Sequence, residues 1–165
     1  MAVRLRALQE GDWPGVLAII ATVAAEGETY TLDHGIGQAQ ARAFWSDAAH
    51  IVVAVDGDRV LGTAKMGPNR AAQGSHVGTA SFMVSPQAQG RGVGRALADH
   101  VVEWHRENGF RAICFNAVVA TNQAAVRLWQ RVGFRVVGTV PGAFRRPNGD
   151  YADLHVMYLE LVGEP

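Results

Sequence analysis

The sequence has 165 residues, of which 48% are hydrophobic and 18% charged, and its fifteen basic and fifteen acidic residues give a formal charge of zero. These values are typical of one soluble globular domain spanning residues 1–165, and they give no sign of a nucleic acid or membrane partner. The single cysteine excludes an internal disulfide and a cysteine-based zinc site, and we expect no metal.

A short strand is predicted at residues 3–8, followed by a helix for which Asp12 is a suitable N-cap. Pro14 suits the first helical turn. Because Asp12 and Pro14 interrupt the approach to the apolar run at 16–25, we interpret this run as a core helix rather than a signal peptide. No run approaches the roughly 20 apolar residues of a membrane span, and we expect a cytoplasmic protein.

Polar and glycine-rich segments separate the next elements. Residues 26–37 are interpreted as a loop, and residues 38–48 as a second helix. Two strands at 50–55 and 59–66 are joined by Asp-Gly-Asp at 56–58, a strong hairpin signal.

The stretch from 76 to 97 combines a strand, a glycine-rich turn and a helix start. The strand is predicted at 76–84, and glycines then alternate between 90 and 94. A helix beginning at about Gly92 would direct its free N–H groups into this turn, which favours an anion. Arg91 and Arg95 add positive charge. The segment therefore predicts a diphosphate-binding loop.

Three phosphate-binding motifs and a plain glycine-rich turn are the alternatives for this segment. A Walker A loop is excluded because no Lys-Ser/Thr pair follows Gly94. The Rossmann fingerprint requires a third glycine where this chain has Arg95. The remaining pattern, Gln89-x-x-Gly92-x-Gly94, resembles the acetyl-CoA loop of the GNAT (Gcn5-related) N-acetyltransferase superfamily.

A second motif of the same superfamily lies downstream, in a predicted helix at 122–132 that follows a strand at 111–118. Its pattern, N-x-x-A-x-x-L-Y-x-x-x-G-F, is matched at Asn122, Ala125, Leu128, Gly133 and Phe134. Trp129 stands at the tyrosine position. Strands at 134–140 and 152–161 complete the chain, and the charged turn at 145–150 is a pocket rim, a dimer contact or a solvated hairpin tip.

The resemblance covers roughly residues 59–144. It implies an α/β sandwich of the GNAT type. In this fold a mixed, largely antiparallel sheet has helices on both faces, and its strands 4 and 5 splay apart. A homodimer is compatible with the family.

The resemblance also implies acetyl-CoA as the co-substrate. Its pantetheine arm would pair with the main chain of Met83 and Val84, while Asn122 would hold it from the other side and Trp129 would pack on it. The diphosphate would bind the amides of Gln89, Gly90, Arg91, Gly92, Val93, Gly94 and Arg95.

The implied reaction is direct attack of an amine on the thioester carbonyl, with the Val84 N–H stabilising the oxyanion. An indole cannot deliver a proton, so either Trp129 only packs or the thiolate leaves unaided. The glutamate base of many relatives falls on Gly78. His76, Glu28 and a water chain are the alternatives.

The acceptor is expected to be a small amine or amino acid bound by Glu28, Tyr30, Thr79 and Asn116. Short motifs, among them Phe82-x-Val84, Phe115-Asn116 and Thr121-Asn122, are similar to those of fungal acetyltransferases that act on proline analogues. This similarity adds cyclic amino acids to the candidate acceptors. Two other functions stay open: acetylation of protein N-termini or ribosomal proteins, and a non-catalytic acyl-CoA-binding sensor.

Overall fold

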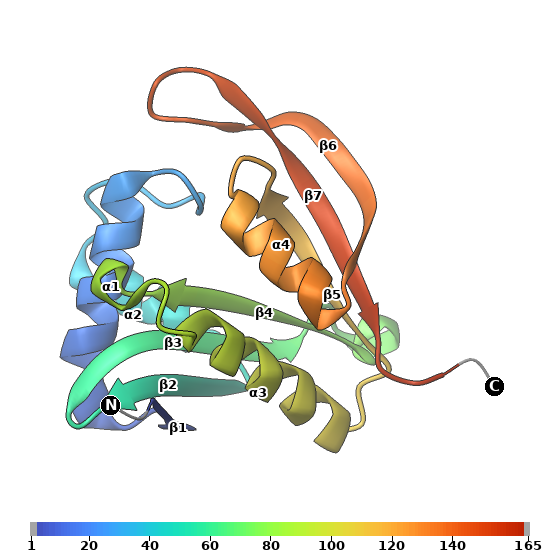
Figure 1. Cartoon of the computed structure of the whole chain (residues 1–165), viewed down its shortest axis with the longest axis horizontal. Helices are drawn as coiled ribbons and strands as arrows, with labels where there is room; N and C mark the ends of the chain where they lie inside the picture. The colour runs from blue at the N-terminus through green and yellow to red at the C-terminus, as the bar shows by residue number, and fades with distance from the viewer. Residues whose placement is uncertain (1–2, 164–165) are drawn as a thin grey trace.

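Within residues 3–163, which the computed structural model describes, seven strands form one sheet in the order β1-β2-β3-β4-β5-β7-β6 (Figure 1). All neighbouring strands are antiparallel except β4 and β5. The predicted mixed, largely antiparallel α/β sheet is thus confirmed. The strands are β1 Arg4–Ala7, β2 His50–Asp56, β3 Arg59–Pro68, β4 Val77–Val84, β5 Ala112–Val119, β6 Arg135–Arg145 and β7 Tyr151–Glu160. The α-helices are α1 Trp13–Glu26, α2 Gln38–Ser46, α3 Val93–Glu107 and α4 Gln123–Val132.

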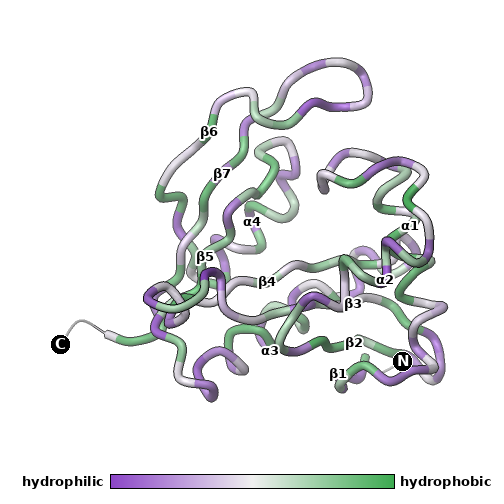
Figure 2. Tube along the Cα trace, turned by 180° about the vertical axis from the view of Figure 1, so that it is seen from behind, coloured by the Kyte–Doolittle hydropathy of each residue, from purple (hydrophilic) through white to green (hydrophobic). Residues whose placement is uncertain are grey.

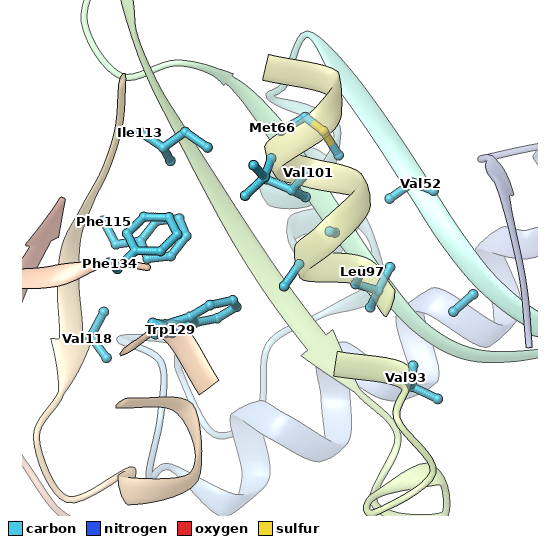
Figure 3. Close-up of a cluster of buried hydrophobic side chains, with 14 of the residues drawn as sticks. Val52, Met66, Val93, Leu97, Val101, Ile113, Phe115, Val118, Trp129 and Phe134 are labelled. Atoms are coloured by element: carbon cyan, nitrogen blue, oxygen red, sulfur yellow. The ribbon is translucent and has the colours of Figure 1, made fainter. Parts of the chain in front are cut away.

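The sheet separates two hydrophobic cores because alternate residues of a strand point to opposite faces. In β2, Val52 belongs to the core under α3 and α4, whereas Val53 belongs to the core under α1 and α2. Figure 3 shows the first of these cores, in which Leu97 of α3 and Trp129 of α4 both take part. Helices therefore cover both faces, as predicted.

β4 and β5 pair over a short stretch and then separate (Figure 1). The paired residues are Val77 with Ala112 and Gly78 with Ile113, at the start of each strand. Among the described strands, the rest of β4 pairs only with β3. This is the predicted splay, and it leaves a gap between the two strands that α4 flanks.

Two local predictions need correction. Asp12 does not cap α1 with its side chain, because two hydrogen bonds of 2.6 and 2.8 Å join its carboxylate to Arg6. These bonds hold the pKa of Asp12 below its ordinary value. The strand predicted at 134–140 continues to Arg145, because Phe144 and Arg145 resume pairing with β7 after an irregularity.

The α1–α2 loop and the turn between β6 and β7 meet at one end of the molecule. Arg146 donates a hydrogen bond from Nε to the Glu28 carboxylate at 3.0 Å. Figure 2 shows the hydrophilic tip of the β6–β7 hairpin on the same side of the molecule as this loop. Of the three readings of the charged turn, this contact favours a rim. No helix of residues 3–163 has the length and apolar character needed to cross a membrane.

Candidate active site

The glycine loop, residues 89–95, connects β4 to α3. Gly90 and Gly92 have φ angles of 75° and 77°, a left-handed conformation that favours glycine. α3 starts at Val93, with Gly92 as its N-cap residue, and among the residues described no side chain makes a capping hydrogen bond at this helix end. The first helical bond runs from the Ala96 N–H to the Gly92 carbonyl at 3.0 Å. The N–H groups before Ala96 are thus left to face the loop, which suits an anion.

Both arginines of the glycine loop lie at its exposed surface. Arg91 contacts the Asp56 carboxylate at 3.3 Å, and Arg95 contacts Asp99 at 2.8 Å. The Arg95–Asp99 pair is exposed and therefore weak, and the Arg91 side chain is 34% exposed although Asp56 is only 18% exposed. An incoming phosphate can therefore reach both guanidinium groups. Positive charge and free amides therefore coincide in one segment.

The main chain of β4 alternates between β3 and the gap. The Ser85 N–H donates to the Leu61 carbonyl of β3 at 2.8 Å, and the same alternation turns the groups of Met83 toward β3. Phe82 and Val84 consequently present their N–H and C=O groups to the gap. Of the two predicted main-chain partners of pantetheine, Val84 has the required direction and Met83 does not.

Tyr30 reaches the gap from the α1–α2 loop. Its hydroxyl accepts from the Phe82 N–H at 2.9 Å and donates to the Phe82 carbonyl at 2.7 Å. Burial raises the pKa of Tyr30 to about 12, so the phenol keeps its proton near neutral pH.

A cavity of about 280 Å³, here called the central cavity, lies at the gap. It brings together five predicted site residues: Tyr30, Thr79, Asn116, Asn122 and Trp129. Its other walls come from the α1–α2 loop, α2, and strands β4 to β7. Among the residues that the structure describes, no carboxylate or imidazole lines this cavity.

Asn122 and Trp129 line the cavity from α4. The Asn122 Oδ1 caps α4 by accepting from the Ala125 N–H at 3.2 Å, so its amide N–H groups are the part left for a ligand. Trp129 is 6% exposed, and its ring lies 4.5 Å from the Phe82 ring and 4.9 Å from the Phe115 ring, centroid to centroid. It is both a core residue and a cavity wall.

Asn116 is held by a second asparagine. Its Nδ2 donates to the Asn69 Oδ1 at 2.6 Å, and the Asn69 Nδ2 donates back to the Asn116 Oδ1 at 3.2 Å. Asn116 lies at the irregularity of β5, where two residues lack pairing with β7. The amide pair therefore orients a side chain that the strand alone leaves free.

The two predicted bases lie outside the lining of the cavity. His76 is exposed and precedes β4 at the paired end of β4 and β5, where its carbonyl accepts from the Arg111 N–H. Glu28 is bound to Arg146, and both side chains are partly exposed. At Gly78, an added Cβ would collide with the buried His105 ring, so a glutamate has no room there.

Three contributors to the site could not be predicted from the sequence. The main chain of Phe82 carries no side-chain signal, and its direction depends on the register with β3. Asn69 lies in a polar loop without periodicity. The charged turn at 145–150 is evident in the sequence, but no sequence pattern indicates that Arg146 pairs with Glu28, 118 residues away.

Comparisons with known proteins identify the family and the fold. The profile described as the Acetyltransferase (GNAT) family matches residues 19–134. The solved structure of a GCN5-related N-acetyltransferase from Kribbella flavida is similar, with a TM-score of 0.92 and 48% sequence identity, and the match covers 97% of this chain and 98% of that chain.

Two curated relatives are more distant. The L-methionine sulfoximine/L-methionine sulfone acetyltransferase of Pseudomonas aeruginosa is 29% identical over 98% of this chain and 96% of its own length. The N-acetyltransferase aca1 of Schizosaccharomyces pombe is 34% identical over 59% of this chain, which spans 47% of that protein. The family match covers both the glycine loop and the splayed strands, and the chain belongs to the acetyltransferase (GNAT) family.

Proposed function

We propose that this protein is an N-acetyltransferase that uses acetyl-CoA to acetylate the amine of a small molecule or amino acid. The observation that carries the proposal is the continuity of three features. The glycine loop offers uncapped amides, the open edge of β4 leads into it, and the central cavity lies at the gap.

The residues present fit acetyl-CoA. An added Cβ at Gly90 or Gly92 would meet no atom within 4 Å, so no neighbouring side chain obstructs the approach of a ligand to the main chain of the loop. The amides of residues 92–95 and the side chains of Arg91 and Arg95 would hold the diphosphate. Val84 would pair with pantetheine, with Asn122 and Trp129 on the opposite wall. When bound, acetyl-CoA supplies the activated acetyl group.

The acceptor would bind in the central cavity against Thr79 and Asn116. Its volume and the uncharged lining favour a small amine over a folded protein surface. The Pseudomonas relative, named for acetylating amino-acid analogues, supports an amino acid or a close analogue, cyclic ones included. A homodimer stays a prediction.

The catalytic groups follow from the same arrangement. The Val84 N–H is our candidate for oxyanion stabilisation, because the alternation along β4 turns it away from β3 and toward the gap. We do not assign the role of general base to His76, because it is exposed and lies outside the cavity. We regard Glu28 as the ion-pair partner of Arg146, which stabilises the rim. Deprotonation of the acceptor is then left to water.

The test combines calorimetry with CoA and acetyl-CoA and an acceptor screen that follows thiol release. The screen should contain free amino acids, methionine sulfone, methionine sulfoximine, cyclic secondary amino acids and peptides with free N-termini. We expect micromolar binding of acetyl-CoA and turnover of at least one free amino acid or analogue. Turnover of protein N-termini alone would contradict the small-acceptor assignment.

One observation favours a second function. Since no carboxylate or imidazole of the described residues lines the cavity, an acyl-CoA-binding sensor without chemistry fits the same site. Acetyl-CoA binding without turnover of any amine in the screen would support the sensor and exclude the enzyme.

A further inference from the structure

Splaying β4 from β5 creates a hydrogen-bonding problem. Main-chain groups that would pair with a neighbouring strand must find other partners, because a buried unpaired N–H or C=O is costly. On β4 the residues that face the gap after the paired end are Ala80, Phe82 and Val84. Phe82 lies in the middle of this open edge.

At Phe82 a single atom, the Tyr30 hydroxyl oxygen, satisfies both main-chain groups. The hydroxyl binds both the N–H and the C=O of Phe82, at 2.9 and 2.7 Å. A strand neighbour would satisfy the same two groups with two atoms. A phenol can do this because its oxygen both donates and accepts, provided it stays protonated. The pKa of about 12 keeps Tyr30 protonated throughout the neutral range.

The loop that carries Tyr30 is itself anchored. Glu28, two residues earlier, binds Arg146 of the β6–β7 turn. The Tyr30 side chain also packs against the core under α1 and α2. The hydroxyl is therefore fixed by the α1–α2 loop, 52 residues away in sequence from the strand residue that it holds.

We propose that Tyr30 is a positioning residue whose hydroxyl fixes the open edge of β4 at Phe82 and so holds the Val84 N–H toward the thioester. This inference rests on the proposed function and departs from the prediction that Tyr30 is a contact of the acceptor. Val84 is the next residue along the strand with the same main-chain direction, so a shift at Phe82 is passed to it directly. Small displacements of a catalytic group are costly, which makes this bond a determinant of turnover.

The test compares Tyr30→Phe, which keeps the ring and removes the hydroxyl, with Tyr151→Phe, which removes an exposed hydroxyl outside the cavity. For Tyr30→Phe we expect a fall in kcat of about tenfold or more, with the Kd for acetyl-CoA and the acceptor KM changed less than about twofold. Tyr151→Phe should match the wild type. A rise in acceptor KM alone would show that Tyr30 is an acceptor contact, and an unchanged kcat would overturn the proposal.

Amide hydrogen exchange gives a readout that needs neither turnover nor ligand. In the wild type the Phe82 amide should exchange slowly and the Val84 amide faster, and acetyl-CoA should then protect Val84. In Tyr30→Phe the Phe82 amide should exchange at least about fivefold faster after correction for global stability. An unprotected Phe82 amide in the wild type would overturn the contact itself. Failure of the wild type to bind acetyl-CoA would instead refute the proposed function, and Phe82 exchange would still decide the contact.

Discussion

The glycine loop and the central cavity lie at the same gap, but they are built differently. The loop is one segment whose main-chain amides are aligned by the start of α3 and by two glycines with positive φ. The cavity is assembled from side chains on the α1–α2 loop, β4, β5 and α4. The contrast teaches that a ligand shared across a family can be bound by local backbone geometry, whereas the acceptor is recognised through tertiary contacts.

The largest effect is expected where the loop depends on a single backbone conformation. Gly92→Val places a β-branched residue at a φ of 77°, a strain of roughly 1–3 kcal/mol, and puts a side chain over the amides. We expect the affinity for CoA, measured by calorimetry, to fall by about 100-fold.

The matched control is Gly109→Val at the other end of α3. Gly109 has a φ of 78°, and an added Cβ there would also meet nothing within 4 Å. This variant should lose stability but bind CoA as the wild type does. Equal affinities of Gly92→Val and the wild type for CoA would show that binding does not depend on the backbone conformation of the loop.

The second effect tests the paired end of β4 and β5, from which the gap opens. Gly78→Ala would drive its Cβ into the buried His105 ring, and overpacking of this kind costs about 1–3 kcal/mol. The free energy of unfolding in urea should drop by that amount. Gly138→Ala on β6 is the control, since an added Cβ there meets nothing within 4 Å, and it should change stability by less than about 0.5 kcal/mol. Equal stabilities would mean that the β4 start relaxes freely.

The same contrast explains what the sequence could predict. The glycine loop, the α4 motif and the order of elements follow from local patterns, and the predicted fold and family are confirmed. The direction of the Met83 main chain could not be predicted, because it depends on the register between β3 and β4. The predicted capping of α1 by the Asp12 carboxylate was wrong, because this carboxylate binds Arg6 of β1 instead of the free N–H groups at the helix start.

The third effect concerns the amide pair that orients Asn116. Asn69→Ala removes both hydrogen bonds from Asn116, and a hydrogen bond is worth about 0.5–1.5 kcal/mol. We expect the acceptor KM to rise by about three- to tenfold while the Kd for CoA is unchanged. In Asn69→Ala/Asn116→Ala the two effects should be less than additive. Additive effects would show that Asn69 does not act through Asn116, and the cavity would lose one of its tertiary contacts.

The smallest effect is expected for substitution of Glu28. Its size decides whether Glu28 is a general base or a structural ion-pair partner of Arg146. A general base contributes about 10²- to 10⁴-fold to the rate, whereas a partly exposed ion pair is worth roughly 0.2–1 kcal/mol. The Glu28 carboxylate is bound to Arg146 at 3.0 Å and does not line the central cavity. We therefore expect Glu28→Gln to change kcat by less than about threefold, with the shape of the pH–rate profile unchanged, and Arg146→Gln to act alike. A loss of 100-fold or more in Glu28→Gln alone would make this residue the base and place a charged group among the neutral walls of the cavity.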